Sequence, residues 1–389
     1  MKRKMTAGGE INLHILHKLP TPYNDTFFRA LHAHEKINLQ VYHLWRGSWR
    51  RPWKTELATG YPNIYMQLKM GLDWGLLKRA WADVDSLFLI ADWGHLASLA
   101  VILTRYVRRA PVAVWADTPQ EEIYRPPVKK WLRRRLLRSL LRRMDIVFGT
   151  GAVGLRVLAT MGAKPERLVN LPCFVDLERP AEARSDGEVG EKALRLRERV
   201  GCGRGGTVFS MVGTLVEKKG NDIGLAAFAR CRRESETPVG MLIVGDGPDR
   251  PMLEKMAADF GLTGSVAFLG WQEPREMESV YLASDAVVHP ARYDPFPLVV
   301  LETMSWSKAV IGSDACGSIE DRVRHGINGM SFRSEDVDDL AKMMIELSGD
   351  PGKLKEMGRR ARETAETWHV AKGVEIIRGH AAELFASNA

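Results

Sequence analysis

Cysteine is scarce in this chain of 389 residues, and long apolar runs are absent. Its four cysteines, Cys173, Cys202, Cys231 and Cys316, form no CxxC pair, so the sequence indicates neither a disulfide framework nor a zinc site. No uninterrupted apolar run reaches the ~18 residues that predict a membrane-spanning helix, and the basic N-terminus lacks the apolar stretch of a signal peptide. We therefore expect a cytoplasmic protein.

Charge is divided unevenly along the chain. Residues 1–180 contain 29 Lys and Arg against 15 Asp and Glu, a net charge of +14, whereas the remainder contains 27 against 33, a net charge of −6. The first part also holds eight of the eleven tryptophans. This asymmetry predicts two domains with different partners, the basic one facing nucleic acid, an anionic membrane or a polyanionic substrate.

Apolar runs of strand length alternate with stretches of helical period in both halves of the chain. The alternation predicts an α/β fold with two doubly wound units, each a parallel sheet covered by helices. Residues 182–206 are polar and rich in glycine, which is typical of a linker. We therefore expect domains at 1–185 and 206–369, with a C-terminal helix at 370–389 that packs back on the first domain.

Two carboxylates lie within one apolar run, RYDPFPLVVLETM, from Arg292 to Met304. Pro297 suits the first turn of a helix, so Asp294 is expected just before the helix and Glu302 on its second turn. Both would then flank the carboxyl end of a strand, where open α/β sheets bind ligands. Alternatively, Asp294 only caps this helix and Glu302 pairs with a lysine.

A lysine stands at a second turn between strand and helix, in MVGTLVEKKGNDIGLAAFA. Lys219 at this place could contact a pyrophosphate as a point charge, although EKKG taken alone fits a solvated surface loop better. A tight turn at Gly245–Gly247 precedes the next helix, which is a weak signal alone because such turns are common in this type of fold.

In order and spacing, these segments resemble the C-terminal half of the retaining glycosyltransferases of family four, which have the GT-B fold. The segments are VGTLVEKKG, VGDGP, VAFLGW, SDAVVHPARYDPFPLVVLE and GSIEDRVRHGINGMSF. The resemblance covers residues 206–389 well and is looser before them. It implies two Rossmann-like domains facing across a cleft, and retaining transfer of a hexose from a nucleotide sugar, UDP-linked, without a metal or another cofactor.

The resemblance also implies roles for single residues. Glu302 would bind the ribose hydroxyls, Asp294 would touch the donor sugar, and Lys219 would neutralise the diphosphate; these three are the expected catalytic residues. The expected nucleotide-sugar site comprises Gly213, Thr214, Lys219, Leu269, Gly270, Trp271, Phe296, Leu298, Val299 and Glu302. The chain departs from the family pattern at Asp294, usually glutamate, at Pro297, usually glycine, and at Thr214, usually arginine.

The stretch KKWLRRRLLRSLLRR, residues 129–143, predicts a basic amphipathic helix. Arg134, Arg135, Arg138 and Arg142 share one side, and leucines occupy the other. Such a helix can lie on an anionic bilayer. Alternatively, its leucines pack on the sheet and its arginines are only solvated.

Two further residues, His95 and Asp117, lie at strand ends that face the expected cleft. They are candidates for the acceptor side, although each alone also fits a structural role.

The leading hypothesis is an enzyme on the inner face of the membrane that transfers a sugar to a lipid-linked or oligosaccharide acceptor. Three alternatives stay open: a nucleic-acid-binding protein, which we do not favour, a non-catalytic sugar-nucleotide-binding regulator, and a nucleotide-sugar epimerase of similar shape.

Overall fold

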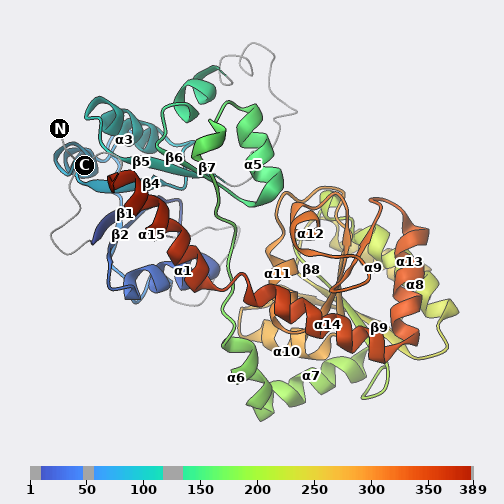
Figure 1. Cartoon of the computed structure of the whole chain (residues 1–389). Helices are drawn as coiled ribbons and strands as arrows, with labels where there is room; N and C mark the ends of the chain where they lie inside the picture. Colours follow the sequence, from blue (N-terminus) through green and yellow to red (C-terminus); the bar gives the residue numbers. More distant parts are fainter. Residues whose placement is uncertain (1–9, 47–56, 117–134, 387–389) are drawn as a thin grey trace. The chain divides into compact units, whose positions relative to one another are not determined.

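The computed structural model describes residues 10–46, 57–116 and 135–386. They form two compact units, one of Met1–Phe174 together with Val370–Ala389 and the other of Val175–His369. Each unit is built on one parallel sheet with helices around it (Figure 1). The α/β class predicted from the alternating apolar runs is therefore confirmed.

The sheet of the first unit has seven parallel strands in the order β3-β2-β1-β4-β5-β6-β7. They are β1 (Ile11–His17), β2 (Ile37–His43), β3 (Asn63–Tyr65), β4 (Ser86–Ile90), β5 (Val112–Ala116), β6 (Ile146–Gly149) and β7 (Leu168–Asn170). Strands of a parallel sheet are covered on both faces, which explains why all residues of β4 and β5 are buried.

Helices cover both faces of this sheet. A single core joins α2 (Trp74–Ala82), α3 (Leu96–Val107), residues 135–144 and α5 (Gly151–Thr160) to Val114 and Ala116 of β5. Trp115 lies between these two residues and therefore points to the opposite face, where its ring meets Phe27 of α1 (Pro22–Ala33). Figure 1 shows α15 (Val370–Ala386) beside α1 on that face, although the two are far apart in the sequence.

The sheet of the second unit has six parallel strands in the order β10-β9-β8-β11-β12-β13. They are β8 (Thr207–Val212), β9 (Val239–Val244), β10 (Val266–Gly270), β11 (Ala286–His289), β12 (Ala309–Ser313) and β13 (Met330–Phe332). The order reverses between β8 and β11, and open α/β sheets bind their ligands at the carboxyl end of such a reversal.

Two layers of helices cover this second sheet. One core contains side chains of α8 (Asn221–Glu234), α9 (Arg250–Asp259), α13 (Val337–Gly349) and α14 (Pro351–Glu366). Other clusters contain α6 (Arg179–Ser185), α7 (Gly187–Arg199), α10 (Glu276–Ala283) and α11 (Leu298–Ser305). A short helix, α12 (Gly317–Arg322), packs with α11.

The segment 182–206, which we interpreted as a linker, lies in the second unit and is largely helical. α6 and α7 bury mainly small or short side chains, such as Ala183, Val189 and Ala193, and leave long polar ones outside. This explains the polar composition of a packed segment. The units meet in the sequence at Phe174 and Val175, not at residue 185 or 206 as expected.

Candidate functional site

Three loops meet at the carboxyl edge of the second sheet, next to the reversal between β8 and β11. The loop after β11 is tied to the loop after β8 because the backbone N–H of Arg292 donates to the carbonyl of Lys218 at 3.0 Å. It is tied to the loop after β12 because the N–H of Gly317 donates to the carbonyl of Asp294 at 3.1 Å. The loops that carry Lys219 and Asp294 are thus held side by side by their main chains.

Gly220 makes this approach possible. Its φ of +63° lies in the left-handed region, and a Cβ at this position would stand 2.0 Å from the carbonyl oxygen of Pro290. Any other residue would therefore push the loop after β8 away from the loop after β11. Gly220 follows the 3₁₀ turn Glu217–Lys219 and caps the N-terminus of α8.

Lys219, Asp294 and His289 form the charged centre of the site. The Nζ atom of Lys219 forms an ion pair with Oδ2 of Asp294. The same oxygen lies 3.0 Å from Nε2 of His289, the last residue of β11. Asp294 and His289 are both buried, and 22% of the Lys219 side chain is exposed. Of these three side chains, that of Lys219 is therefore the most exposed to solvent.

The environment of this centre lowers the pKa values of both Asp294 and His289. Burial opposes the charged form of Asp294, but the hydrogen bond from His289 and the charge of Lys219 outweigh it, so the pKa of Asp294 is lowered. Burial also lowers the pKa of His289. At neutral pH the centre therefore contains a carboxylate, a neutral imidazole that donates through Nε2, and a lysine.

Glu302 lies on α11 and has a different partner. The hydroxyl of Tyr281 on α10 donates to Oε2 of Glu302 at 2.8 Å, and the Tyr281 ring stacks on Trp306 with centroids 5.6 Å apart. Burial raises the pKa of Glu302, although the Tyr281 hydrogen bond and the charge of Arg179 act in the opposite direction. Burial of this carboxylate within an apolar helix therefore lowers the stability of the fold.

These contacts rule out the structural alternatives that the sequence left open for the two carboxylates, and they separate Lys219 from its two neighbours in the loop; ligand binding by these residues stays a prediction. The N-cap of α11 is Pro297, with no side-chain cap hydrogen bond, so Asp294 does not cap this helix. Glu302 accepts from a tyrosine rather than from a lysine. Glu217 and Lys218 are exposed, as expected of a solvated loop, whereas Lys219 turns inward to Asp294.

The other expected nucleotide-sugar residues lie around the same edge of the sheet. Gly213 and Thr214 follow β8, and Thr214 is exposed. Gly270 ends β10, where its carbonyl accepts from the N–H of Gly245 at 2.8 Å, and the next residue, Trp271, is 39% exposed. Leu269 and Leu298 are half-buried.

Phe296 and Val299 have packing roles in this structure. The guanidinium of Arg322 lies 4.5 Å from the centre of the Phe296 ring, and Val299 is buried in a cluster with Tyr281 and Trp306. Both residues therefore shape the segment between Asp294 and Glu302 through packing.

The sequence reasoning did not find His289, Arg292 or Tyr281. Arg292 donates two hydrogen bonds to Asp222 at 2.7 and 2.8 Å, one to the carbonyl of Glu217 at 2.8 Å, and one to Glu335 at 3.0 Å. Its position two residues before Asp294 was the available signal. Tyr281 gave none, because its distance from Glu302 depends on how α10 packs against α11.

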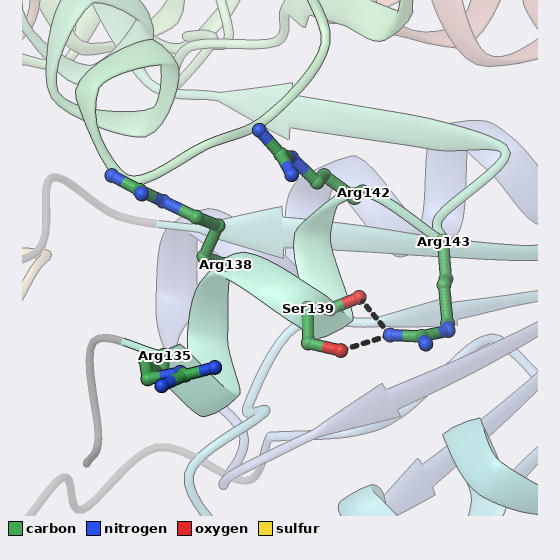
Figure 2. A pocket seen from close by; sticks show the side chains of 5 residues that line it. All are labelled: Arg135, Arg138, Ser139, Arg142 and Arg143. Carbon is green, nitrogen blue, oxygen red and sulfur yellow. Dashed lines mark hydrogen bonds between the residues drawn. The ribbon is translucent and has the colours of Figure 1, made fainter.

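The candidate residues of the first unit, His95, Asp117 and the arginines of the basic helix, do not form one site among the described residues. His95 is the N-cap of α3, where its Nδ1 accepts from the N–H of Ala97 at 3.3 Å, which is a structural role. Asp117 and Arg134 lie outside the described residues. Arg135, Arg138 and Arg142 are exposed and line an open pocket together with Ser139 and Arg143 (Figure 2).

The structure tests one reading of the basic helix, the packing of its leucines, and docking on a bilayer stays a prediction. Leu137 and Leu141 are buried, and Leu141 belongs to the core cluster of the first unit, as expected if the leucines pack on the sheet, whereas Leu136 is 56% exposed. Among the described residues, no group of three or more His, Cys, Asp or Glu could hold a metal ion. No helix in the described ranges has the length and apolarity needed to cross a bilayer.

Known proteins resemble this chain in sequence and in fold. Residues 195–364 match the family described as "Glycosyl transferases group 1". A D-inositol 3-phosphate glycosyltransferase of Nocardia farcinica is 29% identical over 249 residues, which cover 62% of this chain and 53% of that protein. An alpha-D-kanosaminyltransferase of Streptomyces kanamyceticus is 28% identical over 190 residues, or 48% and 47% of the two chains. The chain spans about half the length of these curated relatives.

A solved structure resembles the chain over nearly its whole length. Alr3699/HepE of Anabaena, in complex with UDP, has a TM-score of 0.75 and 18% sequence identity, covering 97% of this chain and 100% of that one. The same protein has also been solved with UDP-glucose, with a TM-score of 0.70 and 19% identity. At this identity the likeness shows the fold, so the predicted GT-B architecture of two Rossmann-like domains is confirmed.

Proposed function

We propose that the protein is a retaining glycosyltransferase that takes a sugar from a nucleotide-sugar donor, UDP-linked, and transfers it to an acceptor. The observation that carries the proposal is the approach of Lys219 and Asp294 at the strand reversal of a unit whose residues 195–364 match group 1 glycosyltransferases. The structural likeness to a protein solved with UDP and with UDP-glucose supports the choice of nucleotide.

Lys219 is the proposed contact of the donor diphosphate. It is partly exposed and its charge is now shared with Asp294, so a diphosphate that enters the site competes with that carboxylate for the ammonium group. A charge-assisted contact to phosphate contributes more than a neutral hydrogen bond. The N-terminus of α8, two residues on, adds the partial positive charge of its unpaired N–H groups.

Glu302 and Asp294 are the proposed contacts of the two sugars of the donor. A carboxylate can accept two hydrogen bonds from the neighbouring hydroxyls of a ribose, and the Tyr281 hydroxyl donates to only one of the two oxygens of Glu302. Asp294, held ionised by His289 and Lys219, would accept from a hydroxyl of the transferred sugar. Leu269, Gly270 and Trp271 would lie along the base.

The chemistry follows from these roles. The bond between the anomeric carbon and the phosphate oxygen breaks while the acceptor hydroxyl forms its new bond on the same face of the sugar. The acceptor proton passes to the departing phosphate oxygen, so no separate general base is needed. Charge on the leaving diphosphate is stabilised by Lys219 and the α8 N-terminus, and this arrangement does not require a metal ion.

The acceptor that we propose is lipid-linked or an oligosaccharide, and the proposed place of action is the inner face of a membrane. The support is the basic first half of the chain and the exposed arginines of residues 135–143. Nucleic acid is not an expected partner, because the match to group 1 glycosyltransferases accounts for the second unit without it.

The proposal is tested by a thermal-shift and hydrolysis screen over UDP and UDP-sugars. Lys219→Ala should weaken the UDP response roughly ten- to hundredfold, as expected for a lost hydrogen bond between charged groups of about 1.5–3 kcal/mol. Glu302→Ala should have a similar effect. The matched control is Lys218→Ala, which removes the same charge from the exposed neighbour and should leave the response unchanged.

Each alternative has its own outcome in that screen. UDP binding without hydrolysis or transfer to any acceptor would favour the non-catalytic regulator, and release of an isomerised free sugar nucleotide would favour the epimerase. If Lys219→Ala and Glu302→Ala respond to UDP as the unchanged protein does, the proposed donor site is wrong.

A further inference from the structure

The outer side of the helical layer that covers the first sheet is unusually apolar. Leu96, Leu103, Tyr106 and Val107 of α3 are 55%, 62%, 49% and 59% exposed. Their spacing of seven, three and one residues places them along one side of the helix. The inward side of α3 has its own apolar residues, including Val101 and Ile102, in the core of the unit. Core packing therefore does not explain the outer stripe.

The neighbouring helix α2 extends this surface with two tryptophans. Trp74 and Trp81 are 63% and 51% exposed. The two helices run side by side: Gly71, before α2, lies next to Leu96 at the start of α3, and Arg108, after α3, stacks on Trp81 at 4.9 Å. We call the exposed residues Trp74, Trp81, Leu96, Leu103, Tyr106 and Val107 the α2–α3 ridge.

Arginines border the α2–α3 ridge on the side of residues 135–143. The guanidinium of Arg143 lies 5.3 Å from the centre of the Tyr106 ring, which joins the open pocket of Figure 2 to the ridge. In Figure 2, Arg138 and Arg142 extend away from the helix, while Arg143 turns back to donate to the Ser139 carbonyl at 2.7 Å. Residues 96–110 and 135–144 contain no Asp or Glu.

We propose that this face of the first unit docks on an anionic lipid bilayer. Leucine and valine would enter the region below the headgroups, tryptophan and tyrosine suit the interface itself, and the arginines would meet anionic headgroups. Each basic residue near such a surface strengthens binding about fivefold. This inference rests on the membrane location in the proposed function and deepens it by naming the docking surface, which is built from residues of the first unit, whereas the proposed donor site is built from residues of the second.

Charge and apolarity together favour a bilayer over other occupants. Nucleic acid would satisfy the arginines but leave Leu96, Leu103 and Val107 in water. A second copy of the same face would bring like charges together. An anionic bilayer satisfies both kinds of side chain.

The test is flotation of the full chain with vesicles of phosphatidylcholine, with or without phosphatidylglycerol, at about 0.15 M salt. The unchanged protein should float only with the anionic vesicles. Leu103→Ser with Val107→Ser should weaken binding at least about tenfold, because the two apolar side chains that would leave water on docking are replaced by polar ones. Arg138→Ser with Arg142→Ser should weaken it as well and reduce its dependence on salt.

The matched control removes two exposed basic residues from the second unit, Lys192→Ser with Arg199→Ser on α7, and should bind within about twofold of the unchanged protein, because neither residue belongs to the proposed docking surface. All variants should keep the denaturant unfolding transition of the unchanged protein, followed by tryptophan fluorescence, because eight of the eleven tryptophans lie in residues 1–180 and this signal separates misfolding of the first unit from lost docking. Loss of the UDP response in the unchanged protein would overturn the proposed function and leave this inference standing.

Three results would overturn the membrane proposal. One is no flotation of the unchanged protein with anionic vesicles. Another is flotation of the Leu103→Ser, Val107→Ser variant at the level of the unchanged protein. The third is a concentration-dependent dimer, or duplex nucleic acid binding, that the same apolar substitutions abolish.

Discussion

Glu302 shows at the scale of one residue how a binding site costs stability. Its carboxylate lies on a mainly apolar helix and accepts from the Tyr281 hydroxyl, and burial raises its pKa. Below the pKa of an unfolded glutamate, about 4.3, the group is neutral in both states and costs nothing. As pH rises through the higher pKa of the folded state, the buried charge forms and stability is lost.

We therefore expect Glu302→Gln to raise the melting temperature at neutral pH while it weakens UDP binding roughly tenfold or more. Glutamine keeps an oxygen that can accept from Tyr281 but carries no charge, so it removes the cost and one charged ribose contact. The gain in stability should vanish near pH 4. Thermal melting from pH 4 to 8, with and without UDP, measures both effects; a variant that is less stable at pH 7 would contradict the argument.

At the same scale, the sequence indicated Lys219 and Asp294 but not why they stay together. Their separation of 75 residues is bridged by main-chain contacts and by His289, whose side chain lies at the end of a buried strand. From the sequence, a histidine within an apolar strand looks like an ordinary core residue. Only its 3.0 Å contact with Asp294 gives it a part in the site.

At the scale of structural elements, Arg292 connects three segments of the second unit. Its guanidinium joins the first turn of α8, through Asp222, to the 3₁₀ turn that carries Lys219, through the carbonyl of Glu217, and to the segment after β13, through Glu335. Arg292 thus holds the position of Lys219 from the loop that carries Asp294. We regard it as a positioning residue, because no contact with the reacting atoms is needed for this role.

We expect Arg292→Gln to weaken UDP binding through Lys219, with a coupling energy of about 0.5–3 kcal/mol between the two positions. Arg292→Lys should recover little, since one ammonium cannot replace a bidentate contact. The decisive measurement is a double-mutant cycle of UDP affinity. If Arg292→Gln weakens binding equally in the Lys219→Ala background, Arg292 acts on general stability and not on the lysine.

Helices at the expected linker show the limit of composition at the element scale. α6 and α7 read as linker because most of their side chains are polar, yet Ala183, Val189 and Ala193 suffice to seat them in the second unit. Small buried residues leave a weak periodic signal. Packing against α10, which no local pattern encodes, decides that these helices are part of the unit.

Each unit of the whole molecule is completed by residues distant in sequence. α15 closes the first unit, where a Cβ on Gly373 would stand 2.4 Å from Cε2 of Phe174 and 2.7 Å from Cε2 of Phe27. Glycine is required at position 373 because a side chain would collide with the two phenylalanine rings, and not because the backbone adopts a left-handed conformation. The last helix of the chain is therefore a structural part of the first unit.

We expect Gly373→Val to destabilise the first unit by about 1–3 kcal/mol, because it overpacks a buried aromatic contact. The UDP thermal shift of the second unit should persist. Gly379→Val on the same helix is the matched control, since nothing lies within 4 Å of its Cβ position, and it should leave stability nearly unchanged. Denaturant unfolding followed by tryptophan fluorescence, which eight tryptophans in residues 1–180 dominate, reports on the first unit. Equal loss of stability in both variants would refute the packing argument.

The sequence by itself determined two α/β units, the edge of the sheet where a ligand would bind, and the lysine and two carboxylates near it. The units, the sheet edge and the carboxylates follow from local rules: apolar runs of strand length, proline and glycine at turns, and acids in apolar surroundings. The choice of Lys219 rested on the resemblance to a known family. The tertiary structure alone decided that Asp294 pairs with Lys219 and His289 and that Glu302 pairs with Tyr281, whereas the return of the last helix to the first unit was already expected from the sequence. It also decided that α3 turns Leu103 and Val107 outward. Such outcomes depend on contacts between residues far apart in the chain, and no local pattern contains them.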